Sequence, residues 1–294
     1  MFARKVCLLA AACGVLTIEA LAQAPPDIDT LLERVGERVA QFYKRAHNIV
    51  WIEKSTAQPI DYRFSPQGFA RQVESELRIE ADDAQDGDDA ATPNVIRELL
   101  KVNGRPPREK DKKNREGCTD PNPISPEPLA FLLPGHRSDF KFTAGGRGRG
   151  KDQRSLIIEF SALKPEGKGE LTEDARGHED CYNVDLPVRL KGRVWVDATS
   201  YDVVRIEQRI AGPGDLHVSP ALQRKRNLPG WMVVERHDTT IKYKMVTFAD
   251  PEEALLLPES IETLTMFRGG LESNRHRQEF SNYRRFVTGG RLVK

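Results

Sequence analysis

The sequence predicts a mainly β (α+β) protein: a curved antiparallel sheet or half-open β-barrel of about nine or ten strands, with an N-terminal amphipathic helix packed on its open side. Three observations predict this fold class. Apolar residues recur at helical spacing in one long segment, near residues 29–46. Most later segments alternate apolar and polar residues, as half-buried strands do. Strands and helices do not alternate along the chain, which disfavours a parallel α/β sheet.

The helix is predicted over residues 29–46, with Asp27 or Asp29 as its N-cap. Its apolar stripe follows a period near 3.6 and consists of Ile28, Leu31, Leu32, Val35, Val39, Phe42 and Tyr43. Charged residues occupy the opposite face. We therefore expect this stripe to lie across the sheet.

Strand patterns dominate the rest of the chain. Strands are predicted at residues 48–57, 60–64, 73–82, 139–143, 155–163, 184–197, 203–210, 231–248, 259–267 and 272–287. Residues 95–102 fit either a helix or a strand, and residues 127–133 predict one helical turn. The best-defined hairpin joins residues 192–197 to 203–207. In it Val194 and Val196 share a face, as do Val204 and Ile206, and Arg205 and Glu207 point outward.

The first 24 residues have the three parts of a secretory signal peptide. A positive start with Arg4 and Lys5 precedes an apolar run over residues 6–21, and Ala22-Gln23-Ala24 gives a cleavage pattern. We expect cleavage after Ala24, and residues 25–294 to form one domain in the periplasm or outside the cell.

Two other interpretations of this segment are disfavoured. A membrane anchor needs about 20 apolar residues, and this run is shorter and contains Glu19. A lipoprotein would be lipidated at Cys13, but more apolar sequence follows that residue. No later segment is apolar enough to span a bilayer, so we expect no transmembrane span in the mature chain.

Cys118 and Cys181 are the cysteines of the expected mature chain. In an oxidising compartment this even pair predicts one structural disulfide, which would stabilise the fold by about 4 kcal/mol in the chain-entropy model. A redox pair is disfavoured because no C-x-x-C spacing occurs. A metal site at residues 178–181 is disfavoured because consecutive residues of an extended chain point in opposite directions.

Charge is balanced overall and uneven locally. The net charge of +1 predicts no general attraction to nucleic acid or to anionic lipid. An acidic stretch at residues 74–89 and a basic stretch at residues 101–115 predict long charged loops near 82–94 and 105–128. These loops are either two separate solvated segments or neighbours at one rim of the fold.

No motif indicates nucleotide binding, a metal or catalysis. Residues 145–151 nearly match a phosphate-binding loop, but Asp152 replaces the Ser or Thr that would hold magnesium, and a strand follows where a helix is needed. A hairpin tip is expected there. The histidines lack zinc-ligand spacing, and neither G-x-S-x-G nor H-E-x-x-H occurs. We therefore assign no catalytic, cofactor-binding or metal-binding residue, and expect neither a nucleotide nor a nucleic acid as partner.

Aromatic and arginine side chains are the candidates for a ligand cavity or its rim. They are Trp51, Trp195, Trp231, Tyr283, Arg284 and Arg285. The tryptophans fit core anchors as well as ligand contacts. An arginine from the closing segment, residues 280–286, either belongs to a charged edge strand or lies at a cavity mouth, where it could pair with an anionic head group.

An exported chain with one N-terminal amphipathic helix, many antiparallel strands and the hairpin of residues 192–207 resembles the LolA/LolB lipoprotein-carrier superfamily, which includes RseB-like sensors. The closing residues 282–286 add to the resemblance, which covers most of residues 29–286. It implies an incomplete barrel with an apolar hollow for acyl chains. The long charged loops depart from the family pattern, and no family residue is carried over by motif.

The leading hypothesis is therefore a non-enzymatic envelope protein that binds a lipid or lipoprotein acyl chain, without a cofactor. The alternative is a scaffold or sensor that recognises another envelope protein or a glycan through its rim loops. A hydrolase with a dispersed site is a weaker third hypothesis, because a fold alone does not exclude catalysis.

Overall fold

The structure is a computed structural model that describes residues 27–46, 48–80, 94–109, 111, 127–149, 152, 154–165, 167–173, 182–186, 188–249 and 252–285. The predicted signal peptide and both cysteines of the predicted disulfide, Cys118 and Cys181, lie outside these residues. So do most of the two predicted charged loops.

Strands make up most of the described chain. The helical elements are α1 (Ile28–Arg45), α3 (Glu127–Ala130), the 3₁₀ helix η1 (Pro134–Asp139) and α4 (Pro220–Arg226). The strands are β1 (Ile49–Ile60), β2 (Arg71–Glu80), β3 (Asn94–Val102), β4 (Phe140–Arg147), β5 (Ser155–Ala162), β6 (Glu170–Glu173), β7 (Tyr182–Asp185), β8 (Leu190–Asp197), β9 (Val203–Ile210), β10 (Gly214–Val218), β11 (Trp231–Ala249), β12 (Glu252–Arg268) and β13 (Ser273–Arg285).

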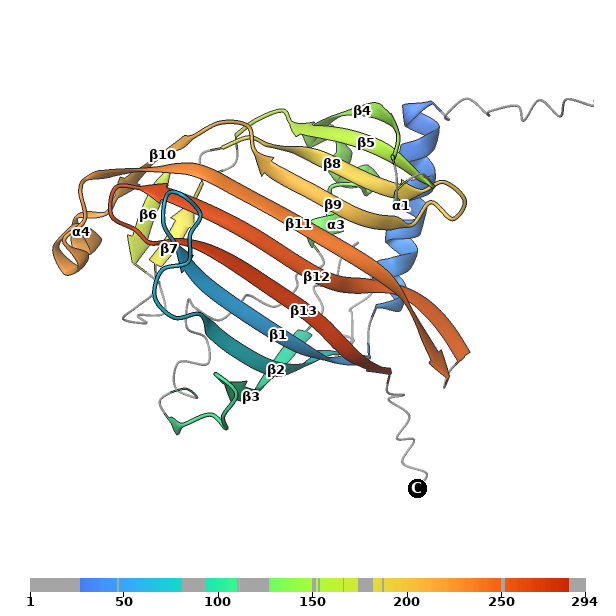
Figure 1. Cartoon of the computed structure of the whole chain (residues 1–294). Coiled ribbons are helices and arrows are strands. Elements are labelled where there is room, and N and C mark those ends of the chain that lie inside the picture. Colours follow the sequence, from blue (N-terminus) through green and yellow to red (C-terminus); the bar gives the residue numbers. More distant parts are fainter. Residues whose placement is uncertain are drawn as a thin grey trace, which may run out of the picture.

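One sheet of 13 strands contains all of them, in the order β3-β2-β1-β13-β12-β11-β9-β8-β5-β4 (Figure 1). The short strands β10, β6 and β7 attach beside β11. All described pairings are antiparallel except that of β10 with β6. The predicted fold class is confirmed. The strand number exceeds the expected nine or ten because the three short strands add to the main row.

Helix α1 forms where the sequence predicts it. Asp27 caps it by accepting hydrogen bonds from the backbone N–H groups of Asp29 and Thr30, at 3.0 and 3.1 Å. The Thr30 hydroxyl also donates to Asp27, and together these bonds lower the pKa of the Asp27 carboxyl. The predicted apolar stripe packs against one face of the sheet. Figure 1 shows α1 crossing the sheet on the side of β4, β5 and β8.

Several sequence predictions differ from the structure. The second strand predicted at residues 60–64 does not form: Ile60 ends β1 and residues 61–64 form a turn, in which the Asp61 carboxylate accepts hydrogen bonds from the backbone N–H groups of Arg63 and Ser65. The single strand predicted at 184–197 is divided into β7 and β8. Val203 is buried in place of Val204, because the register between β8 and β9 shifts after Trp195. The undecided segment 95–102 is a strand, and β12 begins well before its predicted start.

A half-buried arginine clamps α1 to η1. The Arg137 guanidinium donates to the backbone carbonyl of Leu132, at 2.8 Å, and to that of Leu32 in the second turn of α1. Burial lowers the pKa of Arg137. The clamp depends on Gly36, since a methyl group there would lie 2.0 Å from Arg137 Nη2.

We predict that Gly36 and Arg137 are energetically coupled. Arg137→Ala should lower the free energy of unfolding by about 1.5–3 kcal/mol, the contribution of hydrogen bonds to a charged group. Gly36→Ala should destabilise the wild type by displacing Arg137. In the Arg137→Ala background, Gly36→Ala should raise the free energy of unfolding by about 0.5–1 kcal/mol, because alanine favours a helix more than glycine does. The new methyl group would lie 3.1 Å from the Leu132 carbonyl oxygen, which a slight shift of that oxygen accommodates. Denaturant unfolding of the four proteins measures the cycle; additive changes would contradict the clamp.

Candidate functional site

The sheet face covered by α1, called here the inner face, has three bands along its strands. The helix-side band is the apolar cluster under α1, the far band is the apolar cluster around β10 and α4, and the polar band lies between them. Strand β11 crosses all three: its inward side chains are Met232 and Val234 in the far band, His237 and Thr239 in the polar band, and Ile241 and Tyr243 in the helix-side band. The inner face is therefore not apolar throughout.

The helix-side band is filled by its own side chains. It contains Leu156, Ile158, Phe160, Val194, Val196, Val203, Ile206, Ile241 and Tyr243, packed against α1 and Leu129 and Leu132. A cavity of about 30 Å³ remains between α1 and the β11–β12 hairpin, lined by Val39, Phe42, Leu129, Val203, Tyr243 and Leu256 together with Arg38 and Asp202. Ligand pockets usually measure about 300–1,000 Å³. The contact between α1 and the β11–β12 hairpin around this cavity is called here the seam. An acyl chain could enter the seam only if α1 moved.

Polar contacts at the exposed edges of α1 supplement its apolar packing. Arg38 Nε donates to the Ser200 carbonyl at 2.7 Å, and Arg45 Nε donates to Glu253 at 2.6 Å. Exposed ion pairs contribute about 0–1 kcal/mol each. Packing, with the Arg137 clamp, therefore provides most of the force that holds α1 in place.

The polar band is a row of buried and half-buried polar side chains on six strands, most of which are hydrogen-bonded in separate pairs or groups. Glu53 is 1% exposed, pairs with Arg97 at 2.8 Å and accepts a hydrogen bond from Gln278 at 2.6 Å. The other members are Ser55, Ser75, His237, Thr239, Thr263, Thr265 and His276. A buried carboxylate is tolerated only with such partners. This band sets the limit of the apolar surface that α1 covers.

Within the polar band, Ser55 and His276 form the contact that a hydrolase would need. Ser55 Oγ lies 2.8 Å from His276 Nε2. A catalytic nucleophile must also be accessible to substrate. Ser55 is 2% exposed and lines neither the seam nor the groove on the opposite face of the sheet. The contact is therefore structural in this conformation.

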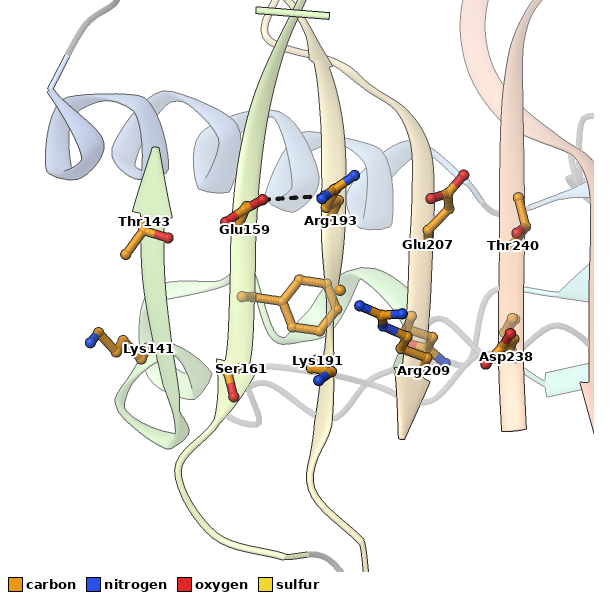
Figure 2. Close-up of a pocket in the computed structure, with 14 residues that line it drawn as sticks. Lys141, Thr143, Glu159, Ser161, Lys191, Arg193, Glu207, Arg209, Asp238 and Thr240 are labelled. Carbon is orange, nitrogen blue, oxygen red and sulfur yellow. Dashed lines mark hydrogen bonds and ion pairs between the residues drawn. The ribbon is translucent and has the colours of Figure 1, made fainter. Parts of the chain in front are cut away.

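The opposite, outer face of the sheet carries an open groove of about 720 Å³. Figure 2 shows its side chains in two rows across the strands, with α1 behind the sheet. One row is Thr143, Glu159, Arg193, Glu207 and Thr240, and the other is Lys141, Ser161, Lys191, Arg209 and Asp238. Phe160, Gly192, Gln208 and Thr239 also line it. The groove is polar and charged.

Two of the sequence candidates lie together. Trp51 is buried, and its ring centroid lies 6.2 Å from that of Tyr283 and 6.4 Å from that of Phe280. The Tyr283 hydroxyl donates to the Pro258 carbonyl, and burial raises the Tyr283 pKa. Both rings therefore belong to the second apolar cluster, next to the β11–β12 hairpin.

The other candidates are dispersed. Trp195 lies on the outer face beneath Arg205, whose Cζ is 4.0 Å from the ring centroid, and Trp231 is 64% exposed at the start of β11. Arg284 pairs with Glu76 at 2.6 Å, and Arg285 pairs with Glu253 near the end of α1. The six residues do not converge on one cavity.

Comparisons with known proteins give two structural matches. No protein-family model matches the chain, and no curated protein matches it. A domain named for outer membrane lipoprotein sorting, from Vibrio parahaemolyticus, is 10% identical with a TM-score of 0.37, covering 90% of this chain and 95% of that one. A LolA superfamily protein from Nitrosomonas europaea is 8% identical with a TM-score of 0.30, covering 92% and 98%.

Among the helices of the described residues, none has the length and apolarity needed to cross a membrane. The His, Cys, Asp and Glu side chains of the same residues form no group of three or more that could hold a metal ion.

We predict that His276 makes stability depend on pH. Burial, and secondarily the charge of Arg97, lower its pKa below the usual value of about 6.5. Below that pH the unfolded chain binds a proton that the folded protein does not, so the free energy of unfolding falls as pH falls. The drop between about pH 7.5 and pH 5.5 should be smaller in His276→Gln, although His237, also buried with a lowered pKa, should leave a residual drop.

Denaturant unfolding at the two pH values measures this difference. His217→Gln is the matched control, because His217 is exposed on β10. An equal pH dependence in the wild type and His276→Gln would contradict the prediction.

Proposed function

We propose that the protein is a non-catalytic binding protein of the bacterial cell envelope that receives a lipid or lipoprotein acyl chain in the seam between α1 and the β11–β12 hairpin. The observation that carries the proposal is the nature of this seam. Apolar side chains from α1, Leu129, β9, β11 and β12 meet there around a small cavity. A single helix covers it.

The energetics of the seam allow binding and release. Each buried CH₂ group of a ligand gains about 0.8 kcal/mol, and an acyl chain could replace the contacts that α1 makes with the helix-side band. Opening costs those same contacts, together with the Arg137 clamp. Because the two terms oppose each other, the ligand is held without being trapped and can pass to a partner.

The polar band gives the proposed site its boundary. Glu53, Ser55 and Gln278 satisfy one another or their neighbours and would lose hydrogen bonds against a methylene chain. The chain therefore runs along the helix-side band and stops at the polar band. This orientation would leave a polar head group at the edge near α1.

The test is uptake of an apolar ligand by purified mature protein. We expect native mass spectrometry of protein from its own periplasm or secreted fraction to show co-purifying lipid, and a fluorescent fatty acid to bind saturably. Leu256→Glu places a carboxylate in the seam and should weaken probe binding at least about tenfold, because a charge opposes burial of the chain. Leu163→Glu is the control, since Leu163 is 54% exposed and lies outside the seam.

Two results would contradict the proposal. One is a protein without bound lipid that takes up no probe; the other is equal binding by Leu256→Glu and the wild type. Either would favour recognition of an envelope protein or a glycan through the rim loops, which stays a prediction. Steady hydrolysis of ester or glycoside substrates would favour the hydrolase hypothesis instead.

A further inference from the structure

The outer groove combines paired acids with unpaired cations. Its three acids each contact an arginine: Glu159 contacts Arg193 at 3.2 Å, Glu207 contacts Arg205, and Asp238 contacts Arg236 at 2.5 Å. The acidic groups that line the groove are thus already neutralised. Figure 2 shows the Glu159–Arg193 pair in the upper row.

The second row holds the remaining cations: Lys141, Lys191 and Arg209. Within the described part of the chain none of the three has an acidic partner within 4.0 Å. Asp238 lies directly across from Arg209 in the sheet, yet its carboxylate is held by Arg236. An excess of positive charge therefore remains in this row.

The sheet register places these cations side by side. Lys191 is the Cα partner of Arg209 on one side and of Ser161 on the other, and Ser161 is the partner of Lys141. Neighbouring strands lie about 4.8 Å apart, so the row spans roughly 15 Å. Like charges directly opposite each other destabilise a sheet. The Lys191–Arg209 pair therefore costs stability unless an anion occupies the row.

We propose that Lys141, Lys191 and Arg209 form a binding site for a phosphate-type oxyanion, with the Ser161 hydroxyl as an additional donor. Guanidinium and ammonium groups make short, strong hydrogen bonds to such oxygens. In the adjacent row Arg193 is already paired with Glu159, so that row offers no unpaired cation to a second anionic group, and the site suits one compact anion. It lies on the face opposite the acyl seam and does not rest on the proposed function.

The ligand is either a free phosphate compound or the head group of a lipid, and one experiment separates the sources. Calorimetric titrations at low ionic strength use inorganic phosphate, glycerol 3-phosphate and a short-chain phosphatidic acid below its micelle concentration. The wild type should bind phosphate saturably and more weakly as salt increases. Equal affinity for all three compounds indicates a free phosphate ligand, whereas much tighter binding of the short-chain lipid indicates a head group.

The variants test the residues. Lys191→Gln/Arg209→Gln should weaken binding of phosphate and of the tightest compound at least about tenfold. Lys54→Gln/Arg275→Gln removes one lysine and one arginine from exposed positions of β1 and β13, outside the groove, and should leave affinity within about twofold. Phosphate should raise the melting temperature of the wild type but not of the Lys191→Gln/Arg209→Gln variant.

That variant should unfold at an equal or higher temperature than the wild type without phosphate, because it removes opposed like charges. The proposal is overturned if the wild type binds none of the three compounds saturably. It is also overturned if both double variants weaken binding equally, since the effect would then be one of overall charge.

Discussion

The packing of α1 against the helix-side band is the contact on which the rest of the inner face depends. The sheet does not close into a complete barrel, so the apolar side chains of β5, β8, β9 and β11 need a cover. One amphipathic helix supplies it. Gly36 brings α1 close enough for Arg137 to reach the Leu32 carbonyl in the second turn of the helix. The same contact that stabilises the sheet thus closes the seam where a ligand would enter.

The polar band explains why α1 needs to cover only one end of the inner face. A uniformly apolar inner face would need cover along its whole length, and α1 covers only one end. Glu53 pairs with Arg97 and Gln278, and the hydroxyl and imidazole groups beside them pair with one another within the sheet. The far band is a separate apolar cluster, packed around α4 and β10. Movement of α1 would therefore expose the helix-side band without disturbing the other two.

Much of the fold could be predicted from the sequence, because periodicity is a local signal. The 3.6-residue stripe predicted α1 to within one residue, and alternation predicted most long strands. The short strands β6 and β10 were missed because four or five residues give too little pattern, and their pairing with each other joins segments distant in the chain. The shift after Trp195 put Val203 inside, which alternation alone does not reveal.

The polar band and the row of cations could not be predicted by local reasoning, for the same physical cause. Alternation places Glu53 and Ser55 on the face of Trp51, but only the β1–β13 register brings Gln278 and His276 to them. The row of cations likewise depends on the order β4-β5-β8-β9, which joins residues far apart in sequence.

The two faces of the sheet are separated by a single layer of backbone, and at Gly192 no side chain adds to this layer. A methyl group there would lie 2.0 Å from the Glu207 carbonyl oxygen and 2.8 Å from the Phe160 ring. Phe160 belongs to the helix-side band and also lines the outer groove. An anion in the groove could therefore influence the seam only by shifting β8 or this ring. Any such coupling must be reciprocal, because linked binding equilibria change each other's affinity by the same factor.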